Sequence, residues 1–149
     1  MKQRTNLPVS VSLGLLLGRL PMGAFFLLAG CAKIRMGVNN FVGFASHSSH
    51  VPAAVPQSFV NGYLHAVPFL EIIVGAMLIL GLFARAGGLI GSLMVISFIV
   101  GSTGWTSPGL PFTPNLIYVG VLLVVLLAGP GCASVDRLVF GPAKPRTEN

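Results

Sequence analysis

Acidic side chains are scarce in this sequence. Glu71, Asp136 and Glu148 are the three acids among 149 residues, against nine Lys and Arg, which gives a net charge of +6. Charged residues make up 8% of the chain and hydrophobic residues 54%, whereas a soluble domain has roughly 25% charged residues. So few charges cannot cover a water-soluble domain, and the composition predicts an all-α integral membrane protein.

Several sequence signatures of chemistry are also missing. Cys31 and Cys132 are not part of a Cys-x-x-Cys pair, and the chain has no phosphate-binding glycine loop, dinucleotide fingerprint or Gly-x-Ser-x-Gly motif. The basic residues stand at the ends of apolar runs rather than along one face with aromatic residues between them, which excludes nucleic acid as a partner. Any redox centre must therefore come from a diffusible quinone or from another subunit.

Apolar runs predict one domain over residues 1–149, built as a membrane four-helix bundle. The expected helices cover about 7–32, 59–84, 87–103 and 115–128, with an outer loop at 34–58 and a tail at 129–149. Basic residues concentrate on the side that carries both termini and the loop between the second and third helices. The positive-inside rule therefore predicts that both termini are cytoplasmic.

The first apolar run also has a second interpretation. Lys2 and Arg4 precede it, and it ends in Leu28-Ala29-Gly30-Cys31, which looks like a lipoprotein cleavage site. The run is longer than the apolar part of a signal peptide and contains Arg19, so an intact membrane span fits it better.

Arg19 and Glu71 are opposite charges inside two different apolar runs. At about 1.5 Å per residue they lie about 18 and 21 Å from the same membrane boundary, so we expect them at a similar depth and able to pair. Pro21 and Pro68 lie close by, and each frees a backbone carbonyl. Two hypotheses stay open: an ion pair that fixes helix register, or a polar pocket that carries a proton or binds the head of a quinone.

The outer loop holds Phe41 and Phe44 at helical spacing, followed by His47 and His50, and His65 enters the second helix. The three histidines are weak candidates for a metal site, because no acidic residue joins them and their spacing matches no compact ligand motif. An interfacial or re-entrant segment is the better interpretation of this loop.

Glycine spacing indicates close helix packing. Gly14 with Gly18, and Gly87 with Gly91, are small-xxx-small pairs, which let helix backbones approach one another. Gly75 follows Glu71 by one helical turn and shares its face of the helix, so a neighbouring helix can come near the Glu71 carboxylate.

The chain resembles the DoxX family of small four-helix membrane proteins. The resemblance rests on the closing run Gly129-Pro130-Gly131-Cys132-Ala133-Ser134-Val135-Asp136-Arg137, on Arg19, Gly23, Phe26, Gly30 and Lys33 in the first helix, and on Glu71, Gly75 and Leu80-Gly81-Leu82-Phe83-Ala84-Arg85 in the second. One departure is that Cys132-Ala133 stands where that family commonly has Arg-Tyr.

The resemblance implies a multi-pass protein of a bacterial-type inner membrane, surrounded by lipid and associated with other membrane or periplasmic subunits. It would be a subunit of a quinone-linked oxidoreductase that presents or binds quinone, with no intrinsic cofactor and no self-sufficient activity. The alternative is a non-catalytic accessory or assembly subunit of a larger membrane complex. The expected pocket or ion pair consists of Arg19, Glu71 and Lys33, and the expected structural cap at the cytoplasmic side consists of Ser134, Asp136 and Arg137.

Overall fold

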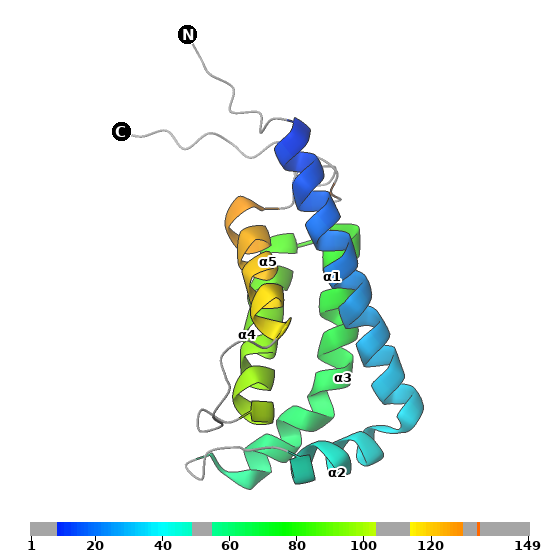
Figure 1. The fold of residues 1–149 in the computed structure, drawn as a ribbon. Coiled ribbons are helices and arrows are strands. Elements are labelled where there is room, and N and C mark those ends of the chain that lie inside the picture. Colours follow the sequence, from blue (N-terminus) through cyan, green and yellow to red (C-terminus); the bar gives the residue numbers. More distant parts are fainter. Residues whose placement is uncertain (1–8, 49–54, 104–113, 130–133, 135–149) are drawn as a thin grey trace, which may run out of the picture.

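The protein is described by a computed structural model that places residues 9–48, 55–103, 114–129 and 134. Every element in these ranges is helical, which confirms the predicted all-α fold. The helices are α1 (Val9–Met36), α2 (Val38–Ser48), α3 (Gln57–Leu80), α4 (Ala84–Thr103) and α5 (Pro114–Ala128). Figure 1 shows α1 running beside α3, α4 beside α5, and α2 across one end of the bundle.

Three of the helices, α1, α3 and α4, are long and apolar enough to cross a membrane. The fourth predicted span is α5, whose 15 residues cover about 22 Å, less than the roughly 30 Å of a bilayer core. The predicted ends of the four segments differ from the observed ends by four residues at most. The chain is thus an integral membrane helical protein, as its composition indicates.

The outer loop contains α2, an 11-residue helix. It is separated from α1 by Gly37 alone, whose φ of 92° is open to glycine and strained for other residues. Asn40 donates a side-chain hydrogen bond of 3.0 Å to the Met36 carbonyl across this bend. Val42 is buried and Phe44 is exposed, so α2 has one face on the bundle and one face away from it.

The turn between α3 and α4 explains why α3 ends earlier than its apolar run. Gly81 adopts a left-handed conformation with φ 66°, and its N–H and that of Leu82 both bond to the Met77 carbonyl. This is the usual geometry of a glycine that closes a helix. Ala84 was expected to end the second helix, but it begins α4 instead.

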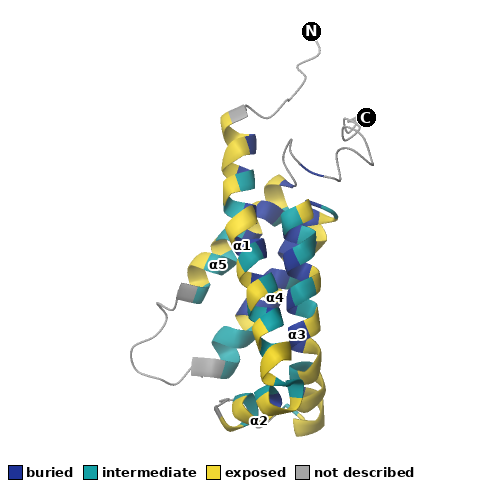
Figure 2. Ribbon diagram, turned by 90° about the vertical axis from the view of Figure 1, so that its right-hand side faces the viewer, coloured by how far each residue is buried: buried dark blue, intermediate teal, exposed yellow. Residues whose placement is uncertain are grey.

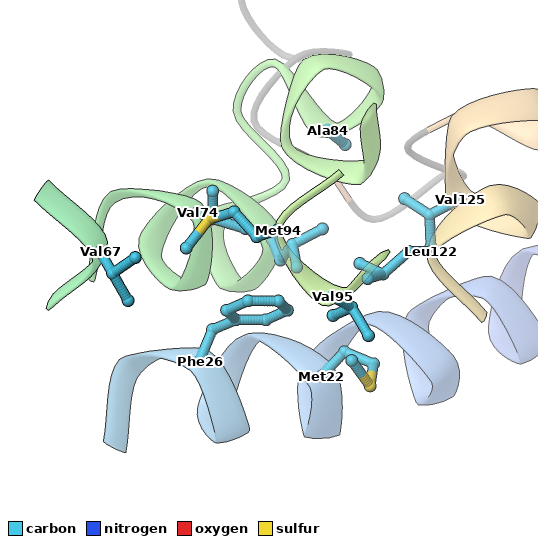
Figure 3. Packing of buried hydrophobic residues seen from close by; sticks show 10 residues of the cluster. Met22, Phe26, Val67, Val74, Ala84, Met94, Val95, Leu122 and Val125 are labelled. Carbon is cyan, nitrogen blue, oxygen red and sulfur yellow. The ribbon is translucent and has the colours of Figure 1, made fainter. Parts of the chain in front are cut away.

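The core lies where α1, α3, α4 and α5 meet (Figure 3). Phe26 of α1 points between α3 and α4, and Met94 and Val95 of α4 lie above it. Leu122 and Val125 bring α5 into the same cluster. The outer faces of the helices are exposed (Figure 2) and carry many large apolar side chains, as expected for surfaces that face lipid.

Two glycine contacts bring the backbones of α1 and α3 together. A Cβ on Gly75 would lie 2.7 Å from the Leu27 nitrogen and 2.8 Å from the Gly23 carbonyl oxygen. A Cβ on Gly30 would lie 2.6 Å from the Pro68 carbonyl oxygen. Side chains at these positions would push the helices apart, so the glycines set the antiparallel register of α1 and α3.

Candidate functional site

The buried carboxylate of Glu71 pairs with Lys33. The Lys33 Nζ lies 2.5 Å from Oε1 and 2.7 Å from Oε2 of Glu71, so both oxygens accept from the same ammonium. The Glu71 side chain is 3% exposed and the Lys33 side chain 21%. The acid is therefore enclosed by protein, while the lysine reaches it from the last turn of α1 with part of its side chain exposed.

Two aromatic rings flank the same ammonium. The Lys33 Nζ lies 5.3 Å from the centre of the Phe41 ring and 5.8 Å from the centre of the Phe98 ring. Both distances fall within the roughly 6 Å over which a ring face attracts a cation. The ammonium thus has a carboxylate from α3 and rings from α2 and α4 around it, so four helices contribute to one small site.

A hydrogen bond between Tyr63 and Ser97 ties α3 to α4 beside this site. Their hydroxyl oxygens lie 2.5 Å apart, and Ser97 also donates to the Met94 carbonyl at 2.7 Å. Ser97 therefore acts as the acceptor toward Tyr63, because its own proton is engaged. Phe98 follows Ser97 directly, so this bond helps to fix the part of α4 that carries the ring.

Arg19 lies elsewhere in the bundle, so the expected common depth of Arg19 and Glu71 is wrong. A Cβ on Gly81 would lie 2.6 Å from Nη1 of Arg19, so the guanidinium sits at the α3–α4 turn. Gly81 follows Glu71 by ten residues, or about 15 Å of helix. The depth estimate failed because it took the start of α1 and the end of α3 as level, whereas Arg19, ten residues after the first residue of α1, lies beside the end of α3.

Ser134 lies in the same region as Arg19. Its side chain is buried, and its Cβ would lie 2.8 Å from a Cβ on Gly81. The other two residues of the expected cap, Asp136 and Arg137, are outside the described residues. A structural role for the three together stays a prediction.

The histidines do not form a metal site in the part of the chain that the structure describes, where no group of three potential ligands occurs. The ring nitrogens of His65 lie 2.8 Å from the Asn61 carbonyl oxygen and 3.3 Å from the side-chain oxygen of Asn39. The second contact joins α3 to α2. His47 is exposed at the end of α2, and His50 is outside the described residues.

Sequence reasoning paired Glu71 with the wrong first candidate and did not identify Phe98, Tyr63 or Ser97. The glycines carried the missing signal. Once Gly30 is taken to face the backbone beside Glu71, the basic residue three positions later on α1 comes within reach of the carboxylate, because successive turns of a helix share a face. No comparable pattern in the sequence points to α4.

Comparison with known proteins identifies the family. The sequence profile of the methylamine utilisation protein MauE matches residues 11–110. This is about two thirds of the chain and includes Lys33, Glu71 and the two aromatic rings beside them. No curated protein and no solved structure matches the chain significantly.

This match corrects the resemblance to the DoxX family. The closing run at 129–137, on which that resemblance depended, lies beyond the matched segment. The glycines of its first two patterns set helix packing, a requirement that different families of small membrane bundles share. The chain belongs to the MauE family, whose members are described as methylamine utilisation proteins.

Proposed function

We propose that this protein is a non-catalytic accessory membrane subunit of a methylamine utilisation system. The observation that carries the proposal is the closed Lys33–Glu71 pair. Both carboxylate oxygens of Glu71 are engaged and the side chain is enclosed, which suits an acid that holds helices in place. The family match supports the metabolic setting.

The pair stands at a point where it can determine the shape of one end of the bundle. Lys33 is followed by the bend at Gly37, after which Phe41 of α2 returns to contact the Lys33 ammonium. The ion pair thus orients both the end of α1 and α2. In an accessory role, a partner protein would bind this end of the bundle, which is formed by α2 and the adjoining turns of α1 and α3.

The test is purification of the tagged protein from its native membrane in mild detergent, followed by mass spectrometry of the proteins and quinones that accompany it. An accessory subunit brings a partner protein in fixed ratio, and Lys33→Gln loses that partner. Arg35→Gln is the matched control, because Arg35 also lies in the last turn of α1 but is exposed. Loss of the partner in both variants, or in neither, would contradict the proposal.

A second candidate is that the site presents quinone to a redox partner. The observation that favours it is the ammonium of the part-exposed Lys33 side chain between two aromatic rings, since an ammonium can donate to a quinone carbonyl and rings can stack on the quinone. Here the Lys33→Gln complex keeps its partner protein and loses its quinone. The same purification therefore separates the two functions.

A further inference from the structure

The end of the Lys33 side chain is chemically an alkylammonium ion. Its last carbon and nitrogen form the group –CH2–NH3+, which differs from methylammonium only by the bond to the rest of the stem. The surroundings of Lys33 therefore show what this protein provides for a primary ammonium group: a carboxylate and two ring faces.

Each of these groups suits such a cation. The Glu71 oxygens accept hydrogen bonds at 2.5 and 2.7 Å, and charge-assisted bonds of this kind are stronger than neutral ones. Phe41 and Phe98 present rings at 5.3 and 5.8 Å, and ring faces attract cations most when water is excluded. A carboxylate with aromatic neighbours is a general solution for binding small organic cations.

Lys33 can leave this position more easily than Glu71 can. Its side chain is 21% exposed, against 3% for the acid, and it stands in the last turn of α1 on a flexible four-carbon stem. Long basic side chains near helix ends commonly extend toward the membrane interface. The lysine therefore has a route away from the carboxylate, whereas the carboxylate has none.

We propose that Glu71, Phe41 and Phe98 form a binding site for primary ammonium ions, which Lys33 occupies in the resting protein and which a small free amine enters when Lys33 turns away. The inference rests on the proposed function for the identity of that amine, methylammonium. The site itself is argued from the contacts. Binding of the amine would release the end of α1 and change the surface that α2 presents to a partner.

The first experiment uses Lys33→Ala, which vacates the site. At pH 7, where aliphatic amines are protonated, thermal unfolding in detergent is followed with methylammonium chloride and with sodium chloride at the same ionic strength. The Tm of Lys33→Ala should be lower than that of wild type. Methylammonium should restore about half of the difference, because it binds the folded state alone. Sodium should restore none of it.

Two controls define the site. The double variant Lys33→Ala/Glu71→Gln lacks the carboxylate and should show no response to methylammonium. Tetramethylammonium has no N–H to donate and should stabilise Lys33→Ala less than methylammonium does. An equal response of single and double variants, or of the two cations, would show a general salt effect and overturn the proposal.

The wild-type protein provides a second measurement that does not depend on the folding of Lys33→Ala. Saturation transfer to 13C-labelled methylammonium should be detected with wild type, and should fall about threefold in Phe98→Leu, which removes one ring. No transfer to wild type, or equal transfer in both proteins, would overturn the inference. Neither outcome bears on co-purification of a partner, so the site and the accessory function can fail independently.

Discussion

Gly75 of α3 faces Leu27 of α1 with no room for a side chain between them: a Cβ at Gly75 would lie 2.7 Å from the Leu27 nitrogen. This contact sets how far α1 is displaced along α3. The displacement in turn places Lys33 beside Glu71, where the two form their ion pair. Backbone packing of two helices thus determines which charges meet.

The first prediction concerns this close approach. Gly75→Ala should destabilise the protein by about 2 kcal/mol or more, because the new methyl group meets backbone atoms of Leu27 and Gly23 rather than movable side chains. Gly62→Ala is the matched control on the same helix, since nothing lies within 4 Å of its Cβ position. It should leave stability unchanged or raise it by up to about 1 kcal/mol. Equal thermal unfolding of the two variants in detergent would contradict the assigned packing.

The second prediction compares two glycines with positive φ. Gly81 has φ 66° and Gly37 has φ 92°, so alanine costs about 1 kcal/mol of backbone strain at either. At Gly81 the methyl group would also meet the Arg19 guanidinium at 2.6 Å, whereas at Gly37 its nearest neighbour is the end of the Asn40 side chain at 3.3 Å.

Gly81→Ala should therefore lower the apparent Tm clearly more than Gly37→Ala does. The additional loss measures how firmly Arg19 and Ser134 are held against Gly81 at the α3–α4 turn. If truncation of Arg19 to Ala removed none of this difference, the guanidinium would not contribute to the obstacle, and the clash would come from Ser134 alone.

The third prediction concerns the hydroxyl pair between α3 and α4. Tyr63→Phe and Ser97→Ala each remove one end of the 2.5 Å contact, and each should cost about 1 kcal/mol. The double variant should cost less than the sum of the two, because the second change removes an interaction that is already lost. Additive losses of unfolding free energy would show that the two hydroxyl groups do not interact.

The sequence was sufficient for most of the architecture. Long apolar runs predict membrane helices because lipid leaves backbone groups no other partner, and the observed ends lie within four residues of the predicted ones. The end of α3 was missed because Leu82 and Phe83 continue the apolar run, although Gly81 had already closed the helix. Hydropathy identifies the residues that lie in lipid. A glycine that ends a helix inside an apolar run leaves the hydropathy of that run unchanged, so hydropathy does not reveal the helix end.

The site was harder to predict, for a physical reason. Glu71 and Lys33 were both candidates, but their pairing depends on the displacement of α1 along α3, which a few contacts at Gly75 and Gly30 determine. The contribution of Phe98 depends further on how α4 is rotated about its axis. The apolar residues of α4 are distributed over all of its faces, so its sequence gives little indication of that rotation.

The fourth prediction tests whether the ion pair acts as a unit. Glu71→Gln leaves the Lys33 ammonium without a counter-charge. Lys33→Met leaves the Glu71 carboxylate, whose side chain is 3% exposed, without a counter-charge. Breaking a fully buried pair from one side costs about 3–5 kcal/mol, and because the Lys33 side chain is 21% exposed, each single variant should be destabilised by up to that amount. The Lys33→Met change should be the worse, because the charge it leaves is the more deeply buried.

The double variant Lys33→Met/Glu71→Gln leaves no unpaired charge and should be more stable than either single variant. Thermal unfolding of all four proteins in the same detergent gives the coupling energy, with Arg35→Gln as the control for loss of a basic residue from the same turn. A coupling near zero would mean that the two charges do not depend on each other. The register of α1 and α3 would then rest on the glycine contacts alone, and neither the accessory role of the pair nor an ammonium site at Glu71 could stand.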